Sequence, residues 1–223
     1  MPDFYLNSYA PLVASKAGRE ASKESQTKLP PFIDGSIRRE PDLECAYPGI
    51  SCLCRAGKFA PRLKVYDLVG YMTRKASYGT GRAHRRFTAL LRVIETLDSH
   101  KAAATWYAER NVTLSNNCMV SGNEANELDH SHRIFKASGC AGDARTHKEW
   151  DLSYHARARK YPRFVICEPV FINVSWDAPE ATDKLLKAVF GRIPGTQNPA
   201  CFTCDKAIKL LDELGIDAQL SVP

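Results

Sequence analysis

The sequence LKVYDLVGYMT, from Leu63 to Thr73, decides the fold class because it joins a turn to a strand-forming run. The pair Tyr66-Asp67 interrupts the apolar residues and predicts the turn, and the β-prone residues that follow predict a strand. The run RFTALLRVIETL, from Arg86 to Leu97, predicts a longer strand. Its alternating apolar residues would share one face: Phe87, Ala89, Leu91 and Val93.

The rest of the chain alternates between strand-forming and helix-forming stretches. Further strands are expected at residues 3–10, 48–54 and 163–174, and Pro169 breaks the last into a bulge or an edge. Helices are expected at residues 99–110, 145–161, 178–191 and 204–215. Ser99 is a suitable N-cap for the first helix, while Gly191 and Gly215 are suitable ends for the last two. Residues 111–144 are expected to be mostly irregular.

These elements predict an α+β fold, with a small, curved, mostly antiparallel sheet or a small β-barrel and flanking helices. We expect residues 1–223 to form a single domain, in which residues 15–28 are an exposed, mobile loop and residues 176–223 a C-terminal helical part. No glycine-rich phosphate-binding fingerprint follows a strand, so dinucleotide-binding and P-loop folds have no support.

Composition and charge narrow the function classes. The 223 residues are 44% hydrophobic and 25% charged, which is typical of a globular protein, and the formal net charge of +6 favours polyanionic partners. The sequence contains neither a secretory signal nor a membrane-spanning apolar run, so we expect a cytoplasmic protein without a membrane partner. The eight cysteines are then expected to be thiols or metal ligands. The sequence implies no cofactor and identifies no protein partner.

Basic residues crowd the segment between Ile37 and Arg92, with Tyr71, Tyr78, His84 and Phe87 interleaved. The cations are Arg38, Arg39, Arg55, Lys58, Arg62, Lys64, Arg74, Lys75, Arg82, Arg85, Arg86 and Arg92. Guanidinium groups grip phosphates, and aromatic rings stack on unpaired bases. The segment therefore fits a nucleic-acid groove, and it equally fits a solvated basic face whose aromatic residues lie in the core.

The run ISCLCRAGKFAPRLKVYDLVGYMT, from Ile50 to Thr73, resembles the nucleotide-modification-associated domains of the PUA-like superfamily, which includes the ASCH, EVE and YTH domains. The resemblance covers about residues 50–105. It implies a small β-barrel with flanking helices and a concave pocket for a nucleobase, often a modified one. Tyr66 departs from the pattern because the family usually has Gly before the Asp, so a turn that needs a positive φ would be strained.

The hypothesis that follows is binding of a nucleic acid or nucleotide, including recognition of a modified base. The expected phosphate-contacting cations are Arg38, Arg39, Arg55, Lys58, Arg62, Lys75, Arg85 and Arg86. Tyr71, Tyr78 and Trp106 are expected to line the base pocket. Gln197 and Asn198 could offer paired donors and acceptors to a base edge.

An alternative hypothesis is an HNH-like nuclease that depends on a divalent metal. It rests on the segment Asp129-His130-Ser131-His132, in which the histidines would be catalytic and, with Asp129, would hold the metal. The sequence CFTCDK, from Cys201 to Lys206, resembles the terminal Cys-x-x-Cys of that family. The histidine segment could instead be a polar surface loop. Cys204 could instead lie at a helix N-terminus, where the pKa of its thiol would be lowered.

Two further interpretations stay open. The alternating acids Glu40, Asp42 and Glu44 could bind a cation, although solvated side chains are the better interpretation. The chain could also be a small-ligand or protein-interaction domain in which the basic residues only confer solubility.

Overall fold

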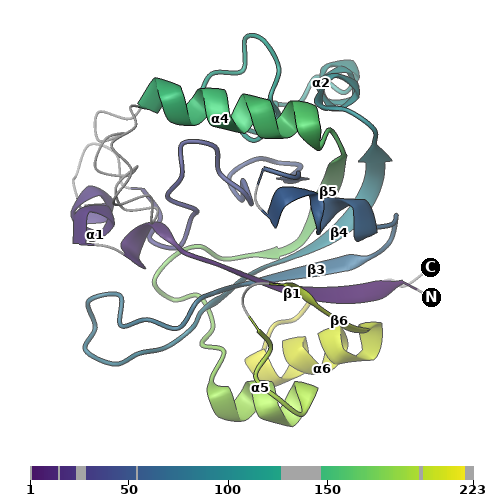
Figure 1. Ribbon diagram of the computed structural model, residues 1–223. Coiled ribbons are helices and arrows are strands. Elements are labelled where there is room, and N and C mark those ends of the chain that lie inside the picture. The colour runs from purple at the N-terminus through teal and green to yellow at the C-terminus, as the bar shows by residue number, and fades with distance from the viewer. Residues whose placement is uncertain are drawn as a thin grey trace.

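The computed structural model describes residues 2–14, 16–23, 29–53, 55–126, 147–195 and 198–218 (Figure 1). Six strands form one sheet in the order β2-β5-β4-β3-β1-β6. They are β1 (Asp3–Tyr9), β2 (Gly49–Ile50), β3 (Leu68–Thr73), β4 (Phe87–Leu97), β5 (Phe164–Ile172) and β6 (Ala200–Thr203). The α+β prediction is thus confirmed.

The sheet is mixed and open rather than closed into a barrel. Strands β1 and β3 pair in parallel, with Asn7 opposite Tyr71, and the other four pairings are antiparallel. Strands β2 and β6 are the two edges of the sheet formed by the described residues. The predicted bulge at Pro169 is confirmed, because the β4–β5 register shifts where Leu91 meets Pro169.

Five α-helices occur within the described residues. They are α1 (Lys16–Lys23), α2 (His100–Glu109), α4 (His147–Lys160), α5 (Asp183–Phe190) and α6 (Cys204–Leu214). Local signals set several ends: the Ser99 side chain accepts a hydrogen bond from the Ala102 N–H at 3.0 Å, while Gly191 and Gly215 have φ of 73° and 66°. None of the helices in the described part of the chain is long and apolar enough to cross a membrane.

Helix α1 corrects the expectation of a loop over residues 15–28. Its composition is polar, but Ala21 is fully buried and packs with Leu12, Leu29 and Ile33. The Ser22 hydroxyl also donates a hydrogen bond to the Leu29 carbonyl at 3.0 Å. The small side chain of Ala21 therefore helps to dock this helix, and it leaves little periodic apolar pattern in the sequence. Residues 15 and 24–28 lie outside the described residues.

The two faces of the sheet are covered differently. Phe4 and Leu6 of β1 pack with α5 and α6, whereas Tyr5 and Tyr9 belong to a core cluster on the opposite face. Figure 1 shows α5 and α6 on one side of the sheet and α4, with long connecting segments, on the other. The C-terminal part expected to be helical also contributes β6, which pairs with β1.

The turn before β3 adopts the conformation that glycine would favour. Tyr66 has φ of 76° and is 53% exposed, so its side chain stays in solvent while its backbone is left-handed. Asp67 holds this turn, because its carboxylate accepts hydrogen bonds from the N–H groups of Asp3 and Lys64, both at 2.9 Å. These bonds offset the strain that the sequence predicted for a positive φ at this position.

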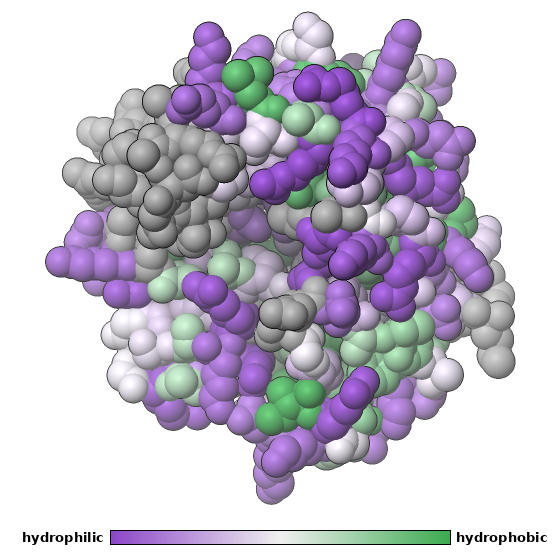
Figure 2. All heavy atoms as spheres, in the orientation of Figure 1, coloured by the Kyte–Doolittle hydropathy of each residue, from purple (hydrophilic) through white to green (hydrophobic). Residues whose placement is uncertain are grey.

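Hydrophilic residues cover most of the face seen in Figure 2, with small hydrophobic patches between them. The large apolar side chains that are exposed among the described residues are Val65, Tyr66, Leu152, Trp176 and Ile208.

Candidate functional site

A polar cavity of about 230 Å³ lies against the sheet face that α5 and α6 leave uncovered. The end of β1, the segment 34–40, the 3-10 turn η2 (Arg55–Gly57) and α4 all contribute to it. Its lining residues are Asn7, Ser8, Tyr9, Ala10, Asp34, Ser36, Glu40, Arg55, Phe59, Tyr71 and Tyr154. Segments far apart in the sequence thus bring acids, an amide, a guanidinium and aromatic rings to one cavity.

Two carboxylates line the cavity from the segment 34–40. The Asp34 carboxylate accepts a hydrogen bond from the Ser36 N–H at 2.7 Å, which closes a tight turn over Gly35. Glu40 is 9% exposed and accepts from the Ser51 N–H at 3.2 Å, and the Ser51 hydroxyl bonds its other oxygen. Both acids are therefore fixed in position by short local contacts.

Burial makes both carboxyl groups weaker acids than usual. It raises the pKa of Glu40 from 4.5 to about 7; hydrogen bonds from Ser51 oppose this rise, and the nearby Asp34 carboxylate adds to it. Burial likewise raises the pKa of Asp34 from 3.8 to about 6, against the hydrogen bonds from Ser36. The cavity therefore carries acids that change charge near neutral pH, a property common at functional sites.

Arg55, Asn7 and Tyr71 form the polar group next to these acids. The Arg55 guanidinium donates to the Asn7 amide oxygen, and its Nη2 lies 3.0 Å from the Ser8 carbonyl oxygen. Burial raises the pKa of the Tyr71 phenol well above its ordinary value, so Tyr71 remains neutral and a hydrogen-bond donor. Arg55 has φ of 66°, a left-handed conformation that a non-glycine residue rarely adopts.

Several cations lie beside the cavity at the end of α4. The Arg157 guanidinium donates to the Leu53 carbonyl at 3.1 Å and lies 5.2 Å from the centre of the Tyr154 ring. Gly57 packs against Tyr161, because a Cβ on Gly57 would lie 2.6 Å from that ring. Leu53 and Gly57 therefore both contact the end of α4. We call the resulting group of cations the basic rim: Lys58, Arg157 and Lys160, whose ammonium lies 5.3 Å from the centre of the Tyr161 ring.

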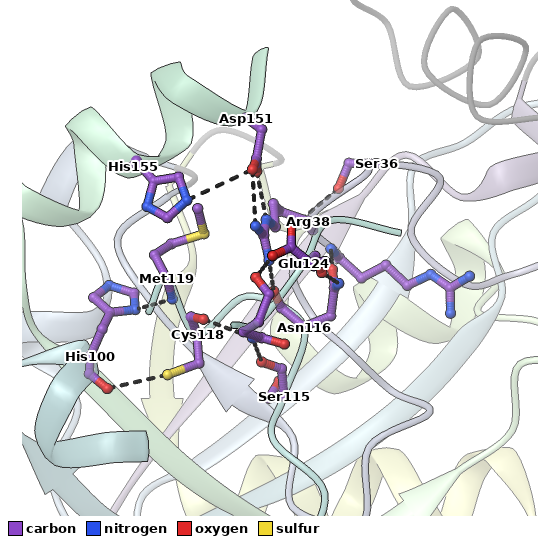
Figure 3. Close-up of polar contacts among 12 residues, drawn as sticks. Ser36, Arg38, His100, Ser115, Asn116, Cys118, Met119, Glu124, Asp151 and His155 are labelled. Atoms are coloured by element: carbon purple, nitrogen blue, oxygen red, sulfur yellow. Dashed lines mark hydrogen bonds and ion pairs between the residues drawn. The ribbon is translucent and has the colours of Figure 1, made fainter. Parts of the chain in front are cut away.

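Arg38 is not available to a phosphate, contrary to the sequence prediction. It is 1% exposed, and its guanidinium forms two bonds of 2.7 and 3.0 Å with the Asp151 carboxylate of α4. The same group donates to the carbonyls of Asn116 and Asn123 at 3.1 and 2.8 Å (Figure 3). Arg39, its neighbour, is paired with Glu44 and is largely buried. These cations hold the fold together.

The cations of the β3–β4 connection bind the segment that precedes and begins α5. Lys75 and Arg85 both pair with Asp183, and the Lys75 ammonium lies 2.6 Å from its carboxylate. Arg86 donates to the Ala178 carbonyl at 2.7 Å.

Of the eight cations predicted to bind phosphates, only Arg55 lines the cavity and only Lys58 belongs to the basic rim. Arg62 is exposed, and its guanidinium lies 5.1 Å from the centre of the Tyr5 ring.

The predicted aromatic walls do not come together. Tyr71, Tyr78 and Trp106 belong to three separate core clusters, and only Tyr71 lines the cavity. Asn198 is exposed in the connection between α5 and β6 and does not line the cavity, while Gln197 lies outside the described residues.

The nuclease hypothesis falls on the undescribed part of the chain, because Asp129, His130 and His132 lie outside the described residues. Among the residues that are described, no group of three or more His, Cys, Asp or Glu side chains is placed to hold a metal ion. The Cys-x-x-Cys pair is divided between the two faces of the sheet: Cys201 is opposite Tyr5, and Cys204 packs with the α5–α6 cluster.

Neither cysteine of that pair has the lowered pKa that a helix N-terminus could give. Burial raises the pKa of both Cys201 and Cys204, and carboxylates around Cys204, including Asp67 and Asp3, add to the rise there. The six described cysteines, from Cys45 to Cys204, are free thiols.

Most of the cavity was not predicted from the sequence. The acids 40, 42 and 44 are expected to be solvated, whereas Glu40 and Asp42 are buried and only Glu44 is exposed. Asn7 and Asp34 were not among the predicted site residues. The available signals were an amide that follows the apolar and aromatic run Phe4–Leu6, and the Asp34-Gly35-Ser36 turn next to an apolar run.

A comparison of the chain with protein-family models found no match, and searches of the curated proteins and of the solved structures found no significant match either.

Proposed function

We propose that the protein binds a nucleotide, free or within a single-stranded nucleic acid, with the base in the polar cavity and the phosphate on the basic rim. The observation that carries the proposal is the junction of the two features at η2. Arg55 lines the cavity, and Lys58, three residues later, belongs to the rim.

The size and lining of the cavity support a base as its occupant. Its volume of about 230 Å³ is below the range of about 300–1,000 Å³ that is usual for drug-sized ligands, so it suits one compact group. Phe59 and Tyr154 supply rings, while Asn7 and the two carboxylates supply hydrogen-bonding groups. Bases are recognised by this combination of stacking and edge contacts.

Charge supports a phosphate at the rim rather than inside. Asp34 and Glu40 would repel a phosphate from the cavity, whereas Lys58 and Lys160 are exposed and attract it. No ion pair joins these two cations to an acid within the described residues, so their charge is not neutralised there. The arrangement gives a bound nucleotide one orientation.

The resemblance to PUA-like domains also implies a nucleobase pocket, but the proposed nucleotide binding rests on the cavity and the basic rim and does not depend on it. A pocket for a modified base, with β-barrel closure, is what that resemblance implies. The described residues form an open sheet. Closure of the sheet into a barrel is therefore only proposed.

The test is a titration with a fluorescent single-stranded oligonucleotide at several salt concentrations. We expect the double variant Lys58→Ala/Lys160→Ala to bind more weakly and to reduce the salt slope by about 0.7 for each phosphate that is no longer neutralised. The matched control is Lys184→Ala/Lys187→Ala, on the exposed face of α5. Both variants remove two lysines and lower the net charge from +6 to +4, so a purely non-specific attraction would change equally in each.

Equal decreases in affinity in the two double variants would contradict binding at the rim. Absence of binding to the wild-type protein at low salt, with either DNA or RNA, would contradict the proposed function as a whole.

A further inference from the structure

We infer that the polar cavity selects bases with an exocyclic amino group, as in cytosine and adenine, over bases with a keto oxygen at the same position. The inference rests on the proposed function and specifies the ligand class of the same site. The observation behind it is the set of hydrogen-bond acceptors and donors in the cavity lining that are not used by contacts within the protein.

The cavity is rich in hydrogen-bond acceptors. Each ionised carboxylate has about four lone-pair sites. Glu40 accepts from the Ser51 N–H, the Ser51 hydroxyl and the Asn117 side chain, and the Asp34 oxygens accept from the backbone and side chain of Ser36 and from the backbone at Glu40. Acceptor sites on both acids therefore remain for a ligand.

Several donors of the lining are committed to the protein. The Arg55 Nη2 group donates to the Asn7 amide oxygen and the Ser8 carbonyl, and the Tyr9 hydroxyl bonds the Phe32 carbonyl. The Ser36 hydroxyl donates to the Arg38 carbonyl at 2.7 Å. These contacts orient the donors of Arg55, Tyr9 and Ser36 toward the wall, so an occupant meets the two acids with the Tyr71 hydroxyl beside them.

An amino group supplies two N–H donors to such acceptors, as carboxylates receive the amino group of cytosine in nucleic-acid recognition. A keto oxygen at the same place would put an acceptor against an acceptor and leave a buried polar group unpaired. A well-formed base contact of this kind corresponds to a preference of about tenfold or more.

The experiment compares two pairs of mononucleotides by calorimetric titration at pH 8, where both acids are ionised. Cytidine and uridine 5′-monophosphate form one pair, and adenosine and inosine 5′-monophosphate the other. Each pair exchanges an amino group for a keto oxygen, and with it the adjacent ring nitrogen changes from an acceptor to an N–H donor, while the phosphate for the basic rim stays the same. We expect the amino member of at least one pair to bind about tenfold more tightly than its keto partner.

Glu40→Gln and Asp34→Asn identify the groups responsible. In Glu40→Gln the amide oxygen can accept from the Ser51 N–H and the amide nitrogen can donate to the Ser51 hydroxyl, so the local bonds of the protonated acid are kept. Either variant replaces an acceptor by a donor, and we expect the amino preference to fall toward one. Glu213→Gln, exposed on α6, is the matched control.

Affinities within about twofold in both pairs would overturn the amino selection while leaving nucleotide binding intact. A clear preference that survives unchanged in both acid variants would overturn its assignment to Asp34 and Glu40. Failure of all four nucleotides to bind at millimolar concentration would overturn the inference together with the binding of free nucleotides. The oligonucleotide titration then reports separately on the basic rim.

Discussion

Glu40 shows how a single buried acid can serve a site at a cost to the fold. Its carboxylate is removed from water, so the protonated form is favoured and the pKa rises to about 7. The unfolded chain has no such environment, and there the group keeps its ordinary pKa of 4.5. The folded protein therefore holds this proton more tightly than the unfolded protein does.

The sign of the pH effect follows from that difference. A raised pKa contributes stability that is fully present below about pH 4.5 and is lost as the pH rises through about 7. Wild type loses this stability between pH 5 and pH 8, and Glu40→Gln does not. The free energy of unfolding of the variant minus that of wild type should therefore rise by up to about 3 kcal/mol between pH 5 and pH 8. Urea denaturation at both pH values measures this difference, with Glu213→Gln as the control.

The same pH dependence in Glu40→Gln and in the wild type would show that Glu40 is not the group responsible. Asp34 adds a smaller decrease in stability in the same direction between its ordinary pKa of 3.8 and about 6, and this part should persist in the Glu40 variant.

At the scale of elements, α4 depends on one buried arginine. Trp150, Tyr154 and Ala158 pack in a cluster with Ile37, and Asp151 closes two bonds with Arg38. Figure 3 shows this carboxylate pointing from α4 toward the Arg38 guanidinium, with His155 on its other side. Because Tyr154 lines the cavity, the docking of α4 also shapes the candidate site.

We expect Asp151→Asn to lower the free energy of unfolding by about 3 kcal/mol, because it leaves the Arg38 charge buried without its counter-ion. Amide hydrogen exchange should rise in α4 more than in β3 and β4. The matched control, Asp212→Asn on the exposed face of α6, should stay within about 0.5 kcal/mol of wild type. Unchanged exchange in α4 would contradict this role of the ion pair.

Elements with local signals were predictable from the sequence. Ser99 precedes α2 as its N-cap, and Gly191 and Gly215 follow α5 and α6, so their boundaries depend on residues within a turn of the helix. The parallel pairing of β1 with β3 was not predictable, because it joins strands that are far apart in the sequence.

The candidate site was predictable only in small part, for a similar reason. Arg38 looks like a surface cation until Asp151, 113 positions later, is known to face it. Glu40 looks solvated until Ser51 and the surrounding segments bury it. Cations that are close in the sequence do not all lie together in space, because Lys75 and Arg85 form ion pairs with Asp183. Arg55 and Lys58 are the predicted cations that remain at the site.

For the whole molecule, the important feature is that the sheet has two unlike faces. Helices α5 and α6 cover one with a continuous apolar cluster. The other is covered by α4 and by the segments around Asp34 and Arg55, and the polar cavity lies there. This asymmetry restricts the proposed binding to one side of the sheet. Control substitutions on α5 and α6, on the other side, should therefore leave the proposed binding unchanged.

The most direct test of binding on that one side is a map of amide chemical-shift changes on titration with cytidine 5′-monophosphate. We predict that the largest changes fall around Asn7, at residues 34–40, at residues 55–59 and in the last turn of α4. Changes that are absent, or that centre on α5 and α6, would contradict the proposed binding.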